Sequence, residues 1–98
     1  LYDLAISHWN IARGYRLLGD ANRSIEYAQK ALEPLSKLNK VAPEINDYLR
    51  SVAIVETEIG HSYLLLDQED KALEYLQKAQ AELEKVVEKD KTVTAYKS

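Results

Sequence analysis

The 98-residue sequence contains no cysteine and no methionine, and it has only three glycines and two prolines. Without cysteine the chain can form neither a disulfide framework nor a thiolate active site, which fits a cytoplasmic location. No apolar run approaches the roughly 20 residues that a membrane-spanning helix needs, and the first residues lack the basic region and long apolar core of a signal peptide. These absences predict a soluble, cytoplasmic chain with no membrane partner.

The charge pattern also lacks a basic excess. The formal net charge is -3, with 46% hydrophobic and 30% charged residues. A phosphate-binding protein needs clustered positive charge, so we expect no nucleic-acid partner. The balance is that of one small globular domain. Because the sequence begins without methionine and is helical in pattern from its first residue, we expect it to be a fragment of a larger protein.

An internal repeat organises the chain. Residues 1–50 and 49–98, aligned without a gap at an offset of 48, share 15 identical residues in 50. Chance would give about 3 at average composition. The identical pairs include Ala5/Ala53, Ile6/Ile54, Tyr15/Tyr63, Leu17/Leu65 and Leu35/Leu83. A repeat of this length predicts a stack of similar supersecondary units.

Apolar residues recur every three or four positions, which predicts four helices. Their expected ranges are 1–18, about 21–40, 44–66 and about 69–88. Gly19 followed by Asp20 predicts a tight turn between the first two helices, and residues 67–70 predict the second such turn. Pro34 predicts either a kink or an early end of the second helix. Pro43 predicts the start of the third helix.

The apolar stripes of these helices define a predicted core. In the first helix the stripe is Leu1, Leu4, Ala5, His8, Ile11, Ala12 and Tyr15, and in the second it is Ala21, Ser24, Ile25, Ala28, Ala31, Leu32, Leu35 and Leu38. In the third it is Ile45, Tyr48, Leu49, Val52, Ala53, Glu56, Ile59, Gly60 and Tyr63, and in the fourth Ala72, Leu73, Leu76, Ala79, Leu83 and Val86. Residues 91–98 align with the start of the third helix, so they predict the stub of a further helix.

The repeated unit resembles a tetratricopeptide repeat. The residues that carry the resemblance are small ones late in the first helix of each unit, a tyrosine three positions later, and two small residues in the second helix; they are Ala12/Gly60, Tyr15/Tyr63, Ser24/Ala72 and Ala31/Ala79. The chain departs from the family pattern at Ala28/Leu76 and at His8/Glu56. Its period of 48 exceeds the usual length of about 34, which implies long helices similar to those of arrays appended to bacterial serine/threonine protein kinases.

The resemblance implies an all-α, right-handed α-solenoid of antiparallel hairpins. Its expected parts are repeat 1 (1–42), repeat 2 (43–90) and the stub (91–98). It also implies a concave groove that binds a partner peptide or protein. The groove-facing candidates carried over are Ile6, Trp9, Arg13, Arg16, Thr57, His61 and Leu64.

Trp9 and Arg13 form the sharpest pair of candidates, because tryptophan and arginine are enriched in binding hot spots. The alternatives are that Trp9 packs against a neighbouring helix or a second copy of the chain, and that Arg13 and Arg16 are solvated surface residues. For the whole chain we expect a scaffold or adaptor module. The alternatives are a ligand-sensing or peptide-sensing regulatory domain, or the accessory array of a signalling enzyme.

No metal, cofactor or catalytic site is expected in the chain itself. The two histidines, His8 and His61, do not form a metal-binding motif. The acidic turn at Asp67, Glu69 and Asp70 lacks the rest of a calcium loop and is expected to cap a helix. Because about three repeats are needed for stable stacking, we expect self-association through exposed end faces. The candidates there are Leu1, Leu4, Tyr75, Val87 and Tyr96.

Overall fold

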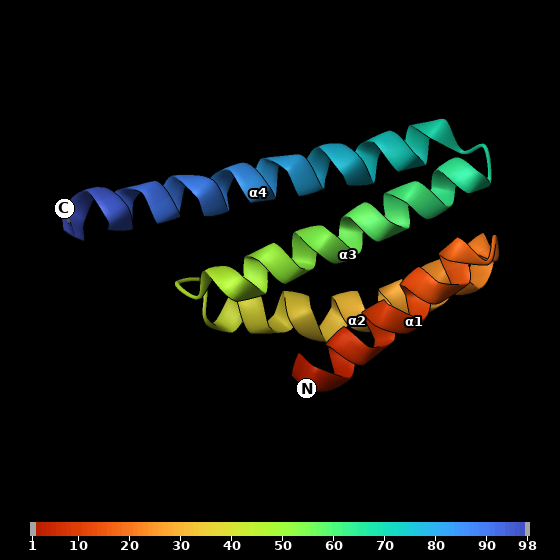
Figure 1. Cartoon of the computed structure of the whole chain (residues 1–98), viewed down its shortest axis with the longest axis horizontal. Coiled ribbons are helices and arrows are strands. Elements are labelled where there is room, and N and C mark those ends of the chain that lie inside the picture. The colour runs from red at the N-terminus through yellow and green to blue at the C-terminus, as the bar shows by residue number, and fades with distance from the viewer. Residues whose placement is uncertain (1, 98) are drawn as a thin grey trace.

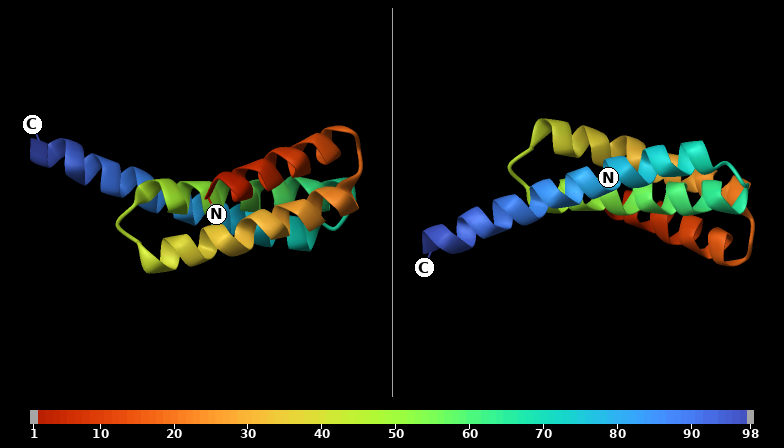
Figure 2. Two further views of the ribbon diagram at one scale, coloured as in Figure 1. Left: turned by 90° about the horizontal axis from the view of Figure 1, so that it is seen from below. Right: turned by 90° about the horizontal axis from the view of Figure 1, so that it is seen from above.

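The computed structural model describes the backbone of residues 2–97 and the side chains of residues 2–90. The helices are α1 (Tyr2–Leu17), α2 (Ala21–Val41), α3 (Asn46–Leu65) and α4 (Glu69–Lys97), and the described residues contain no strand. Successive helices run antiparallel and pack against each other in chain order, and α1 also contacts α3 (Figures 1 and 2). The predicted all-α repeat of two helical hairpins is therefore confirmed.

The two hairpins turn in the same way. The backbone amide of Asp20 donates to the carbonyl of Tyr15 at 2.9 Å, and the amide of Gln68 donates to the carbonyl of Tyr63 at 3.0 Å. These bonds satisfy free carbonyls at the ends of α1 and α3, as in a Schellman motif. Gly19 has a φ of 84°, which glycine adopts without strain. The predicted turn at Gly19 is confirmed.

The start of α2 is capped by a side chain. Asp20 accepts a hydrogen bond from the backbone amide of Arg23 at 3.1 Å, which satisfies one of the free amides at the helix N-terminus. In the second hairpin, Asp67 occupies the position of Gly19 and has a φ of 58°. A residue with a Cβ atom has a conformational cost there, so the second turn is the more strained of the two.

The helix bounds near the two prolines differ in part from those predicted. The helix α2 continues through Pro34 to Val41, so of the two predicted outcomes, a kink or an early end, the early end is wrong. Fully buried Leu35 anchors the residues beyond the proline. The helix α3 begins three residues after Pro43, because the amide of Ile45 donates to the carbonyl of Ala42 at 3.1 Å and Pro43 stands in that turn.

The last helix is longer than predicted. The backbone of residues 91–97 continues α4, which ends at Lys97, where the sequence predicted the stub of a separate helix. The sequence has no glycine or proline after residue 88 that would end α4 there, and the modest helix propensity of Thr92, Val93 and Thr94 does not interrupt it. Within the described part of the chain, no helix combines the length and apolar character required to cross a membrane.

A shared core joins the first three helices. Its buried members are Ala5 and Ala12 of α1, Ala28, Ala31 and Leu35 of α2, and Val52, Val55 and Ile59 of α3. The helix α3 is covered by α1, α2 and α4, so it also buries residues outside its predicted stripe, including Ser51, Glu58 and Ser62. The hydroxyl groups of Ser24 and Ser62 meet at 2.8 Å inside the α2–α3 contact.

The outer helices bury less than their stripes predicted. In α4, Ala72, Ala79 and Val86 are buried as expected, but Leu73 and Leu83 are exposed. Over the described side chains α4 packs mainly against α3, with one hydrogen bond from Gln29 of α2 to the hydroxyl of Tyr75, so only a narrow stripe of α4 is covered. In α1, Leu4 and Ile11 are exposed on the side that neither α2 nor α3 covers, and the predicted stripe residue Ile45 is exposed in the turn just before α3.

Candidate functional site

Two rows of side chains occupy corresponding positions on α1 and α3. The rows have the spacing i, i+7, i+11, which keeps their members on one side of a helix. They consist of Ile6, Arg13 and Leu17 on α1 and of Ile54, His61 and Leu65 on α3, and we call them together the inner face. All except half-buried Ile6 are exposed.

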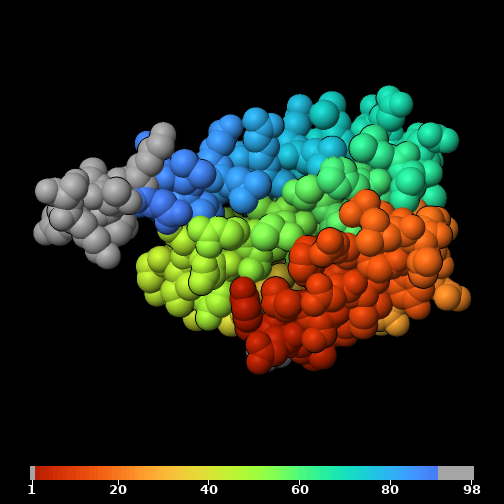
Figure 3. Space-filling view, viewed as in Figure 1, coloured from red at the N-terminus to blue at the C-terminus, as the bar shows by residue number. Residues whose placement is uncertain are grey.

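The inner face points away from α2 and α4. The opposite side of α1 contacts α2: there the ring of Tyr15 stacks on Tyr27 of α2, with ring centroids 5.6 Å apart. On α3 the equivalent Tyr63 stacks on Tyr75 of α4 at 5.8 Å. The rows lie about half a turn around each helix from these tyrosines. In the space-filling view, α1 stands in front and α3 is visible between α1 and α4 (Figure 3).

Two predicted site residues, Trp9 and Arg16, lie between helices. The side-chain Nε of Arg16 donates to Oε1 of Glu58 on α3 at 2.7 Å, and both side chains are largely buried. Trp9 stands two turns before Arg16 and packs against the core of α1, α2 and α3. The guanidinium of Arg13 lies 5.9 Å from the centre of the Trp9 ring, within cation–π range. The Trp9 ring therefore lies between the core and the exposed guanidinium of Arg13.

Thr57 and Leu64 occupy the equivalent positions on α3, but no described helix covers them as α3 covers α1. Thr57 donates from Oγ1 to the carbonyl of Ala53 at 2.8 Å, and it lines an open groove with Leu76 and Leu83 of α4. Leu64 is exposed. The structure thus places Ile6, Arg13 and His61 on the inner face, Trp9 and Arg16 at the α1–α3 contact, and Thr57 and Leu64 beside the α4 groove.

Three apolar members of the inner face were missed as site candidates. They are Leu17, Ile54 and Leu65, all exposed. Part of the signal was present in the sequence, because the apolar pairs Ile6/Ile54 and Leu17/Leu65 are identical in the two repeats, although none of these four side chains is buried in the core. Identity at an exposed apolar position indicates a shared surface rather than a shared core.

A charged cluster around buried Glu56 lies between α3 and α4. Fully buried Glu56 forms an ion pair with Lys78, whose Nζ is 3.0 Å from Oε2 of Glu56. Burial, followed by hydrogen bonding to Glu56 and its charge, raises the pKa of Glu82 to about 8. Hydrogen bonding to Glu56 and its charge raise the pKa of Lys78. This cluster joins two helices of one hairpin and is separate from the inner face.

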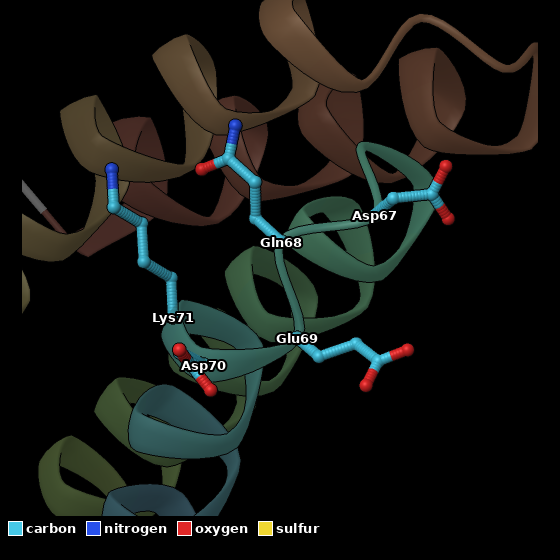
Figure 4. A pocket seen from close by; sticks show the side chains of 5 residues that line it. All are labelled: Asp67, Gln68, Glu69, Asp70 and Lys71. Atoms are coloured by element: carbon cyan, nitrogen blue, oxygen red, sulfur yellow. The ribbon is translucent and has the colours of Figure 1, made fainter.

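The acidic turn between α3 and α4 does not gather its carboxylates. Figure 4 shows the side chains of Asp67, Glu69 and Asp70 pointing in different directions around the turn. Among the described residues, no three histidine, cysteine, aspartate or glutamate side chains come together as a possible metal site. Glu69 and Asp70 instead lie in the first turn of α4, where negative charge favours the helix dipole.

Comparison with known proteins identifies the repeat. The family model for the tetratricopeptide repeat matches residues 5–33 and 57–82, which together make up more than half of the chain. The first match covers most of α1 and the start of α2, and the second covers the end of α3 and the start of α4. No curated protein and no solved structure matches the chain. On the family match, the chain belongs to the tetratricopeptide repeat family.

Proposed function

We propose that the chain is a protein-interaction module that binds a partner segment on its inner face and performs no catalysis itself. Tetratricopeptide repeats generally mediate protein–protein interactions. The observation that carries the proposal is the placement of two matching rows on α1 and α3, pointing away from α2 and α4. A module built this way presents one continuous surface made by alternate helices.

The chemistry of the inner face defines the partner segment. Leu17, Ile54 and Leu65 expose apolar side chains that contribute binding free energy when water is excluded. Arg13 adds a positive charge beside them, and its guanidinium lies within cation–π range of the Trp9 ring. A segment that presents apolar side chains and an acidic side chain to Arg13 matches this surface.

The contacts beneath the inner face keep the two rows in register. The Arg16–Glu58 pair joins the C-terminal part of α1 to the middle of α3, and the hydroxyl groups of Tyr2 and Ser51 join the other end at 3.0 Å. Holding both rows at a fixed separation reduces the ordering that binding would otherwise require. Trp9 and Arg16 thus act as positioning residues in this proposal.

Peptide selection tests the proposal and does not require the partner itself. A random displayed peptide library is panned on the 98-residue chain, and the dissociation constant of an enriched peptide is measured by calorimetry. We expect Arg13→Ala and Ile54→Ala each to weaken binding by about tenfold, as hot-spot truncations do. Trp9→Ala is unsuitable because Trp9 packs against the core.

The matched control changes the far side of the molecule. Lys37 and Val41 are exposed on the outer surface of α2, so Lys37→Ala and Val41→Ala should leave the dissociation constant unchanged. Circular dichroism should show full helicity in all four variants. Peptides that lose affinity with the α2 changes and keep it with the inner-face changes would overturn the proposal.

A further inference from the structure

The contact between α2 and α3 is made by two surfaces, and the repeat places an equivalent of each surface, exposed to solvent, on α1 and on α4. In that contact, Leu35 of α2 is 0% exposed, and Val52 and Ile59 of α3 are 5% and 0% exposed. All three belong to one buried cluster. Subtracting 48 from the α3 residue numbers gives the equivalent positions on α1, and adding 48 to the α2 residue numbers gives those on α4.

On α1, the counterparts of Val52 and Ile59 are Leu4 and Ile11. They are 57% and 43% exposed, and we call them the α1 patch. Two turns of helix separate them, as they separate Val52 and Ile59, so both pairs present the same ridge. The α1 patch is a copy of the surface that α3 uses to pack on α2, without the helix that would cover it among the described residues.

On α4, the counterpart of Leu35 is Leu83, which is 36% exposed. Leu83 lies in an open groove of about 690 Å³, lined also by Leu76, Thr57 and exposed Val87, which we call the α4 groove. Leu76 corresponds to Ala28, which is fully buried against the core. The α4 groove is therefore the copy of the surface that receives α3.

Polar groups at the two surfaces also correspond. The Tyr2–Ser51 hydrogen bond between α1 and α3 has its counterpart in Arg50 and Asp3. Arg50 already pairs with Asp47 and Asp90 of its own chain, and the same stacking would bring Asp3, which carries the opposite charge to Arg50, to the edge of this ion-pair network. The buried Ser24–Ser62 pair has its counterpart in Ala72 and Gly14. Gly14 has no side chain and the methyl group of Ala72 is already buried, so neither residue blocks close approach.

We propose that a second copy of the chain docks head-to-tail, with the α1 patch of one copy in the α4 groove of the next. The contact is heterologous, because it joins two different surfaces and leaves one of each free for further copies. Of the predicted end-face residues, exposed Leu4 and Val87 lie on these surfaces, Tyr75 is half-buried under Tyr63, and Leu1 and Tyr96 lie outside the described side chains. The inner face stays open in this assembly.

Sedimentation velocity of the 98-residue chain tests the proposal. We expect the average mass to rise continuously with concentration beyond that of a dimer, as open head-to-tail association requires. Ile11→Glu blocks the α1 patch and Leu83→Glu blocks the α4 groove. Each variant alone should remain monomeric, and an equimolar mixture should form a 1:1 dimer through the one intact pair of surfaces.

Disulfide trapping gives a second readout that does not depend on the charged variants folding. The chain contains no cysteine, so Ile11→Cys and Leu83→Cys each introduce a single thiol. Mixed and oxidised, they should give a crosslinked heterodimer in several-fold excess over either homodimer. A monomer at all concentrations, a dimer that does not grow further, or equal crosslinking in homodimers and heterodimers would overturn the proposal.

Discussion

Gly60 of α3 lies directly against Leu76 of α4: a Cβ atom added to Gly60 would stand 2.7 Å from Cγ of Leu76 and 3.3 Å from the carbonyl oxygen of Ala72. The Leu76 side chain can move, but the backbone oxygen cannot. Gly60→Ala should therefore lower the free energy of unfolding by about 1–3 kcal/mol. Urea denaturation at low protein concentration measures the change.

Gly14 provides the matched control. It also lies inside a helix, but an added Cβ would meet nothing within 4 Å. Gly14→Ala should raise the free energy of unfolding by about 0.5–1 kcal/mol, because alanine favours helix. A loss of stability in both variants, or in neither, would show that the close approach of α3 and α4 is not the cause.

The pKa of Glu82 predicts an unusual dependence of stability on pH. Below its unfolded pKa of about 4.5, Glu82 is protonated in both states, and between that value and about 8 only the folded state keeps the proton. The free energy of unfolding should therefore fall as pH rises through this range. Because the side chain is partly solvated, we expect a total loss of about 1–2 kcal/mol.

Glu82→Gln isolates this effect. The amide stays neutral at every pH and keeps the shape of the protonated acid, so the loss of stability between about pH 5 and 8 should disappear in the variant. Thermal denaturation of both proteins across this range gives the comparison. Parallel curves for the two proteins would contradict the assignment of the raised pKa to Glu82 in its site beside Glu56.

The Arg16–Glu58 pair predicts a coupled pair of variants. Arg16→Met should lower the free energy of unfolding by about 2–3 kcal/mol, because it leaves the buried carboxylate of Glu58 without its partner. Arg16→Met combined with Glu58→Met should recover most of that loss. Additive losses measured by chemical denaturation would mean that the two side chains do not interact in solution.

The second turn offers a stabilising change. Asp67 stands at a φ of 58° where the first hairpin has Gly19. Asp67→Gly should raise the free energy of unfolding by about 0.5–1 kcal/mol by relieving this conformation, and Gly19→Ala should lower it by about 1 kcal/mol. Thermal denaturation distinguishes these opposite shifts; a lower melting temperature for Asp67→Gly would contradict the turn geometry.

Local features of the fold were predictable because local chemistry determines them. Gly19 and Asp20 mark the first turn through backbone freedom and a side-chain cap, and the 48-residue repeat carries the same turn to Asp67. Pro43 was misplaced by three residues because proline suits a turn as well as a first helical turn. Pro34 did not end α2, because burial of Leu35 outweighs a lost hydrogen bond.

Which side chains are buried, and what they contact, was less predictable, because this depends on which helix covers each side of its neighbour. A single stripe describes an outer helix, but α3 is covered by three neighbours and buries Glu58 and Ser62 outside its stripe. Arg16 resembled a groove residue until Glu58, 42 positions away, proved to be its partner. The seven site candidates shared helices and a family pattern, yet only Ile6, Arg13 and His61 lie on the inner face.

Binding of the partner on the inner face can be mapped residue by residue with a nuclear magnetic resonance titration. A selected peptide is added to the isotope-labelled chain, and the shifts of the backbone amides are followed. We expect the largest shifts to cluster around Arg13, Ile54 and His61, with little change along Glu33–Val41 of α2. Shifts concentrated on the outer surfaces of α2 and α4, with the inner rows unperturbed, would show that the partner binds elsewhere.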